Sequence, residues 1–273
     1  MEFDWNDLDE IKEGGMIEDD PMEPINRKVT PIFFLIDVSG SMTGRKIDIV
    51  NQSMEQIMHD LADMNNSADF DLRFAVLSFG TNCIWETGDS LQQCTGDWNH
   101  LGADGLTYFN TACRELREKL SSKHGFFNFA TGKTITPPVI ILLTDGYAND
   151  GDQDGIDGVK ELRENKYFKG SFKLAIAIGD DANQTLCKNF TGDNELVFTA
   201  YTSKALQGLL NAVIKGSVVV SSSGTSNPNP DGNQEPDMFE PNKEYLKDVL
   251  TSEIDSNPDL DESVNSADNI IWD

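Results

Sequence analysis

Between residues 30 and 216, apolar residues form continuous runs that alternate with stretches of helical spacing. Apolar runs at residues 32–36 and 139–143, and a mostly apolar run at 172–178, are typical of strands buried on both faces of a sheet. Residues 71–79 form a further predicted strand, and segments 83–85 and 196–199 are predicted as short strands.

Helical spacing separates these strands at residues 47–61, 107–120, 158–167 and 203–214, with a short helix near residue 186. Alternation of this kind implies βαβ units and a mostly parallel sheet with helices on both faces. We therefore predict a doubly wound α/β fold. In such folds ligands bind beyond the carboxyl ends of the strands, where the strand order reverses.

Charge divides the chain into three parts. Of the net charge of −26, residues 1–28 carry −7 (ten acids, three bases) and residues 217–273 carry −11 (thirteen acids, two bases). The remaining −8 lies in residues 29–216 (24 acids, 16 bases). This predicts an acidic N-terminal extension (1–28), one folded domain (29–216) and a flexible acidic tail (217–273). Spacing within the tail predicts a short amphipathic helix at 243–254.

The acidic balance and the apolar pattern exclude several classes of partner. A strongly negative surface repels nucleic-acid phosphates and anionic membranes, and it favours metal cations or basic proteins. No apolar run approaches the roughly 18 residues of a membrane span, and the first residues do not resemble a secretory leader. The four cysteines are widely spaced, which favours free thiols in a reducing cytoplasm, although an even number leaves disulfides open.

A polar cluster follows the first buried run, at Asp37, Ser39 and Ser41. If the chain leaves the strand in a tight loop, these alternate side chains converge on one point. One carboxylate and two hydroxyls are hard oxygen donors that suit Mg²⁺ or Mn²⁺. The alternative is an ordinary connection from strand to helix, where Asp and Ser are common capping residues.

Two later residues favour the metal interpretation. Thr107 stands at the start of a predicted helix, and Asp145 follows the buried run at 139–143. Because such ends meet in one crevice of a doubly wound sheet, both residues add hard oxygen atoms to the predicted site.

With these residues the chain resembles a von Willebrand factor type A domain over about residues 30–216. That family carries a metal-ion-dependent adhesion site (MIDAS), which consists of D-x-S-x-S, a Thr, and an Asp in a T/S-D-G context. The resemblance implies that Ser39, Ser41 and Thr107 ligate Mg²⁺ directly and that Asp37 and Asp145 act through water. It also implies an open coordination position that accepts an Asp or Glu carboxylate from a partner protein.

Within the family, three segments look most like cytoplasmic bacterial proteins associated with tellurite-resistance and stress systems (TerY-like). They read LLTDGYAND, FKLAIAIGDDAN and GLTYFNTA. This narrower resemblance implies a kinase or phosphatase as partner. The acidic ends of the chain have no counterpart in the family pattern.

A second stretch, DGDQDGIDGVKE, matches the spacing of a calcium-binding loop. Its ligands would be the side chains of Asp150, Asp152, Asp154 and Glu161 and the backbone carbonyl of Ile156, with a turn at Gly155. The alternative is a solvated insertion leading into a helix that favours acids in its first turn. A strand, rather than the helix of an EF-hand, precedes this loop.

From the sequence we expect a metal-dependent protein-binding module rather than an enzyme. One alternative is a non-catalytic, partner-recruiting subunit of an ATP-driven complex such as a chelatase. The other is a metal-dependent hydrolase, for which no general base is available beyond the aspartates of the site. The chain has no G-x-S-x-G elbow and no G-x-x-x-x-G-K-[ST] phosphate loop.

Overall fold

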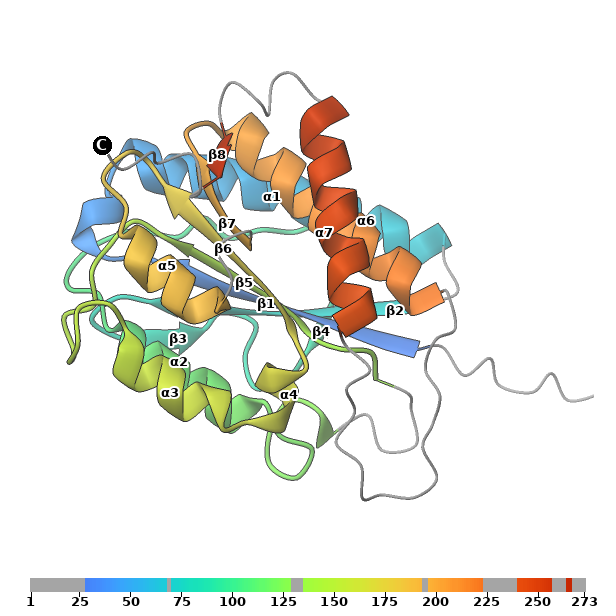
Figure 1. Ribbon diagram of the computed structural model, residues 1–273, viewed down its shortest axis with the longest axis horizontal. Coiled ribbons are helices and arrows are strands. Elements are labelled where there is room, and N and C mark those ends of the chain that lie inside the picture. Colours follow the sequence, from blue (N-terminus) through green and yellow to red (C-terminus); the bar gives the residue numbers. More distant parts are fainter. Residues whose placement is uncertain are drawn as a thin grey trace, which may run out of the picture.

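A computed structural model describes residues 28–67, 70–128, 135–192, 196–222, 240–256 and 264–266. Its described strands form one eight-stranded mixed sheet in the order β3-β2-β1-β5-β6-β7-β8, with β4 paired to β2 (Figure 1). The strands are β1 (Lys28–Asp37), β2 (Phe70–Phe79), β3 (Cys83–Trp85), β4 (Gln92–Gln93), β5 (Val139–Thr144), β6 (Phe172–Ile178), β7 (Val197–Ala200) and β8 (Val264–Ser266). The five strands from β2 to β7 in this order pair in parallel, and β3, β4 and β8 are antiparallel additions.

Helices cover both faces of the sheet (Figure 1). On one face lie α1 (Arg45–Ser67) and α6 (Ser203–Ser222), with α7 (Glu240–Ser256) packed against α6. On the other lie α2 (Phe109–Lys119), α3 (Ile156–Arg163), α4 (Lys166–Lys169) and α5 (Gln184–Thr191). In β1, Phe34 packs into the core on the α1 side and Phe33 into the opposite core, because successive side chains point to opposite faces. The predicted doubly wound α/β fold is therefore confirmed.

The strand order reverses at the middle of the sheet, between β1 and β5. The chain passes from β1 to β2 on one side, and later places β5 against the other side of β1. Ile36 lies opposite Leu143 in this parallel pair, so the two strands end together. The first residues beyond these strands therefore share one crevice, where the sheet rule places a ligand.

Part of the predicted C-terminal tail forms regular structure in the described residues. Helix α6 continues past residue 216 to Ser222, and α7, which includes the predicted helix at 243–254, buries Leu246 and Leu250. A Cβ atom at Gly216 would lie 2.8 Å from Leu246 Cδ2, so glycine permits the close approach of α6 and α7. Strand β8 also pairs with β7 at the sheet edge. The predicted N-terminal extension lies outside the described residues, apart from Lys28.

Candidate metal site

Asp37 is the last residue of β1, and its side chain is fully buried. Two neighbours fix its carboxylate: the backbone N–H of Ser39 donates to Oδ1 at 2.9 Å, and Thr144 Oγ1 donates to Oδ2 at 2.6 Å. Burial raises the pKa of Asp37 to about 6, although these hydrogen bonds act in the opposite direction. A buried carboxylate that ionises reluctantly is one that a nearby cation would stabilise strongly.

The loop after β1 turns Ser39 and Ser41 toward the end of β5. Ser39 Oγ lies 3.1 Å from Ser41 Oγ, and Ser41 Oγ donates to Asp145 Oδ1 at 2.7 Å. The turn is a short 3-10 helix, Gly40–Met42, and it is fastened by the backbone N–H of Gly40, which donates to Gly105 O at 2.9 Å. The D-x-S-x-S segment and Asp145 therefore form one hydrogen-bonded chain across the strand switch.

Thr107 joins the same crevice from the loop before α2. Its backbone N–H donates to Asn149 Oδ1 at 2.9 Å, and the backbone N–H of Asn149 donates back to Thr107 O at 2.8 Å. This reciprocal pair ties the Thr107 loop to the loop after β5. The sequence analysis did not identify Asn149, because its contribution depends on a contact between loops 42 residues apart.

Gly146 shows how closely the oxygen atoms of the site converge. A Cβ atom at this position would lie 3.2 Å from Thr107 Oγ1, 3.4 Å from Asp37 Oδ2 and 3.6 Å from Ser41 Oγ. Two loops thus present oxygen atoms to the space beside Gly146, and the loop after β5 adds Asp145 through its hydrogen bond from Ser41. The structure brings together all five residues that the sequence predicted for the site.

Lys46, in the first turn of α1, is a second residue that the sequence analysis missed. Its Nζ contacts Asp145 Oδ2 and donates to Asp181 Oδ1 at 2.6 Å. Partial burial lowers the pKa of Lys46, but the hydrogen bonds to Asp145 and Asp181 outweigh it, so the pKa rises above its ordinary value. The side chain is therefore a permanent positive charge beside the site.

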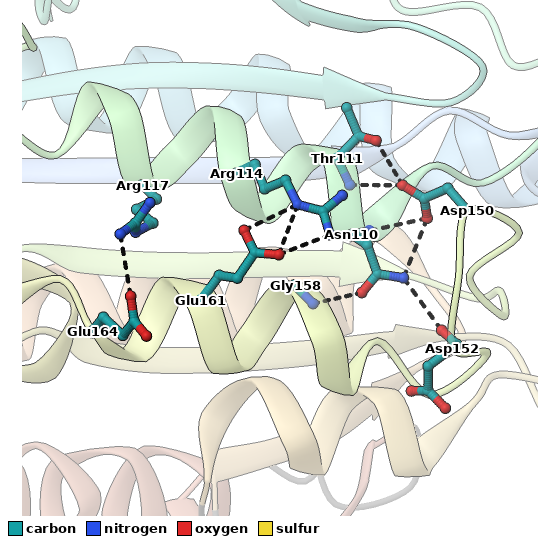
Figure 2. A network of polar contacts seen from close by, with 9 residues as sticks. All are labelled: Asn110, Thr111, Arg114, Arg117, Asp150, Asp152, Gly158, Glu161 and Glu164. Carbon is teal, nitrogen blue, oxygen red and sulfur yellow. Dashed lines mark hydrogen bonds and ion pairs between the residues drawn. The ribbon is translucent and has the colours of Figure 1, made fainter.

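The structure does not bring the predicted calcium ligands together at one point: Asp150 and Glu161 face different partners (Figure 2). Asp150 accepts hydrogen bonds from the backbone N–H groups of Asn110 and Thr111 at the start of α2, whereas Glu161 pairs with Arg114. The other predicted ligands have partners of their own. Asp152 accepts a hydrogen bond from the backbone N–H of Ile156, the first residue of α3, at 2.8 Å. Asp154 accepts a hydrogen bond from Asn183 Nδ2 at 3.2 Å.

In the described part of the chain, no three His, Cys, Asp or Glu side chains are close enough to hold a metal ion. The crevice beside Gly146 has just two such carboxylates, so its donors are mainly hydroxyls. That donor set suits a hard cation that retains bound water.

All four cysteines lie in the described residues and are free, and burial raises the pKa of both Cys83 and Cys187 to about 12. Among the described helices, none is long and apolar enough to cross a membrane.

Comparison with known proteins identifies the family. The family model of the von Willebrand factor type A domain matches residues 32–212, which is most of the folded part. The chain belongs to this family. Its curated relatives include human inter-alpha-trypsin inhibitor heavy chain H6, which is 30% identical over 172 residues. That match covers 60% of this chain and 12% of the relative. The chain spans 12% to 19% of the length of the curated relatives it matches.

Solved structures share the fold at low sequence identity. The vWF domain of the type V pili tip protein Mfa5 from Porphyromonas gingivalis is 12% identical, with a TM-score of 0.54, and the match covers 75% of this chain and 99% of that one. Proximal thread matrix protein 1 from the mussel byssus, solved with a zinc occupied MIDAS motif, is 20% identical, with a TM-score of 0.50. That match covers 70% of this chain and 46% of the mussel protein. At these identities the likeness concerns the fold of the type A domain alone.

Proposed function

We propose that this von Willebrand factor type A domain is a metal-dependent protein-binding module. The observation that carries the proposal is the convergence of hydroxyl and carboxylate oxygens from three loops around Gly146. Family membership supports it, because a complete D-x-S-x-S, Thr and T-D-G set occupies this crevice.

Ser39, Ser41 and Thr107 would ligate the cation, and Asp37 and Asp145 would support it from behind. When bound, the cation supplies a Lewis-acidic position that attracts an anionic oxygen of a partner. Mg²⁺ fits this site best, because the donors are hard oxygens and only two are carboxylates; Mn²⁺ has similar preferences. The zinc occupied MIDAS motif of the mussel protein supports binding of a divalent cation at such a site.

The surroundings of the crevice support a protein ligand that offers an Asp or Glu. Leu106, beside Thr107, is 48% exposed, and Tyr147, two residues after Asp145, is 53% exposed. Exposed aromatic and aliphatic side chains commonly anchor protein interfaces. A partner carboxylate flanked by apolar side chains would meet the cation and both of these residues at once.

The cellular setting remains a prediction. The free thiols support a reducing compartment such as the cytoplasm. The tellurite-resistance grouping and a kinase or phosphatase partner rest on the sequence resemblance alone, and the curated relatives found are inter-alpha-trypsin inhibitor heavy chains. A chelatase-type recruiting subunit would use the same crevice, whereas a hydrolase would additionally need a base.

Direct metal binding tests the proposal. Titration with Mn²⁺, followed by the paramagnetic resonance signal of the free ion, should reveal one site in the wild type and none in Ser39→Ala/Ser41→Ala. A matched double variant, Ser121→Ala/Ser122→Ala, changes two serines in the loop after α2 and should bind as the wild type does. Equal Mn²⁺ binding by all three proteins would refute the proposal.

Partner binding is tested separately by affinity capture from native lysate in Mg²⁺ and in EDTA. The proposed module retains its partner only in Mg²⁺, and Tyr147→Ala should weaken capture without changing Mn²⁺ affinity. If the same partner is captured in Mg²⁺ and in EDTA, and by both the wild type and Ser39→Ala/Ser41→Ala, the crevice is not the binding site.

A further inference from the structure

Lys46 has an unusual place for a lysine, because it lies in the first turn of α1. The amino end of a helix carries partial positive charge, so a cation there is disfavoured unless something compensates. The compensation is visible: its ammonium contacts Asp145 from the end of β5 and Asp181 from the loop after β6. The lysine side chain is 21% exposed, the Asp181 side chain is 74% exposed, and the Asp145 side chain is fully buried.

The fold makes room for this lysine. Gly179 is the first residue after β6 and has a φ of +91°; a Cβ atom there would lie 3.0 Å from Lys46 Cε and 3.7 Å from Nζ. A side chain at this position would crowd the end of the lysine side chain and would strain the backbone. The ammonium is built into the site rather than resting on its surface.

Asp145 is shared between two groups. Its Oδ1 accepts from Ser41 Oγ on the side of the predicted metal ligands, whereas its Oδ2 faces Lys46. Lys46 therefore neutralises one of the two carboxylates of the site without a metal. The same positive charge opposes a divalent cation bound beside Ser41, because like charges at short range in a partly buried site repel strongly.

We propose that Lys46 is a resident counter-cation, anchored by Asp181, that keeps the metal-free site stable and lowers its affinity for divalent cations. The inference rests on the proposed function, since it concerns the same crevice. It identifies Lys46 as an affinity-determining residue that acts through Asp145 and not as a ligand.

The test compares Mn²⁺ affinity among variants that separate charge from hydrogen bonding. Lys46→Met removes both, Lys46→Gln removes the charge and keeps a donor, and Lys46→Arg keeps the charge. Arg45→Met is the matched control: it removes the same charge from the neighbouring residue, whose guanidinium contacts only Tyr201 O, at 3.5 Å, within the described part of the chain. Lys46→Met and Lys46→Gln should bind Mn²⁺ at least about tenfold more tightly than wild type, and Lys46→Arg within about threefold of it.

Salt and heat provide two further readouts. The higher Mn²⁺ affinity of Lys46→Met should persist at about 0.5 M salt, whereas any effect of Arg45→Met on Mn²⁺ affinity acts over a longer distance and should be screened. In EDTA, Lys46→Met should melt at a lower temperature than Arg45→Met, because Asp145 and Asp181 lose their counter-ion. Added Mn²⁺ should then raise its melting temperature by more than it raises that of the wild type.

The outcomes distinguish the two proposals. If Lys46→Met and Lys46→Gln bind no more tightly than Arg45→Met, while Ser39→Ala/Ser41→Ala abolishes binding, the role of Lys46 is overturned and the metal site stands. If Lys46→Met binds Mn²⁺ more tightly but Lys46→Gln does not, the hydrogen-bond donor of Lys46 matters and its charge does not. That result would also overturn the role of Lys46 as a counter-cation. If no variant, Lys46→Met included, binds Mn²⁺, both proposals fail.

Discussion

Asp150 should stabilise the domain by capping α2 from outside that helix, and Asp150→Ala tests this directly. The residue before the helix, Tyr108, provides no side-chain cap. Asp150 instead accepts from the backbone N–H groups of Asn110, at 3.1 Å, and Thr111, at 2.6 Å, and from Thr111 Oγ1 at 2.7 Å (Figure 2). These are the donors that a capping side chain normally satisfies.

The contacts give the expected size of the effect. Loss of a helix cap costs about 1–2 kcal/mol, and a carboxylate at the positive end of a helix adds roughly 0.3–1 kcal/mol. The charged hydrogen bond from the Thr111 hydroxyl contributes about 1.5–3 kcal/mol more when broken, although these terms overlap. We expect Asp150→Ala to lower the free energy of unfolding by about 2–4 kcal/mol, and Asp150→Asn by roughly half as much.

Urea unfolding in EDTA, followed by circular dichroism, measures this difference. The matched control is Asp157→Ala in the first turn of α3: its side chain is exposed and makes no hydrogen bond or ion pair with the described residues. Asp157→Ala should lower the free energy of unfolding by no more than about 1 kcal/mol, because it removes one acid from the first turn of α3. If Asp150→Ala and Asp157→Ala unfold at the same urea concentration, the capping argument is refuted.

Three further predictions concern the site and the C-terminal helix. Burial raises the pKa of Asp37 from 3.8 to about 6, so in EDTA stability is lost as the pH rises through this window. In EDTA, the free energy of unfolding of Asp37→Asn should therefore exceed that of the wild type by about 2–3 kcal/mol at pH 7, and the two should become equal below pH 4. A difference of the same size at both pH values would contradict this prediction. Asn149→Leu should weaken Mn²⁺ binding through Thr107, and Asn149→Asp, which keeps the acceptor, should restore it; equal losses would count against this role. Leu246→Ala should cost about 2–4 kcal/mol in the main urea transition, and an unchanged transition would mean that α7 is not part of the cooperative unit.

The fold, and the meeting of the five predicted residues in one crevice, could be predicted from the sequence because both depend on local patterns. Apolar runs such as residues 32–36 identify buried strands, and the positions of Asp37 and Asp145 at strand ends follow from the strand pattern together with the topology of a doubly wound sheet. The D-x-S-x-S spacing is itself a local signal, since one tight turn orients all three side chains.

The features that the sequence missed depend on contacts between distant segments. Lys46 reads as an ordinary surface lysine until β5 and β6 place Asp145 and Asp181 beside it. Asp150 fits a calcium template by spacing, and only the position of α2 gives it another role. Spacing predicted a helix at 243–254, but only the position of α6 shows that α7 buries Leu246 against it.

Because the proposed site spans the junction of β1 and β5, metal binding would depend on the folding of the sheet. Ser41 and Asp145 are 104 residues apart, and they meet only once the two central strands have paired. A partly folded chain with β1 and β2 alone would lack Thr107 and Asp145, two of the five site residues, so the ion would bind the native state preferentially. By mass action, each tenfold excess of free metal over its dissociation constant would then add about 1.4 kcal/mol of stability to the whole sheet. Metal supply would thus control how long the domain survives as well as what it binds.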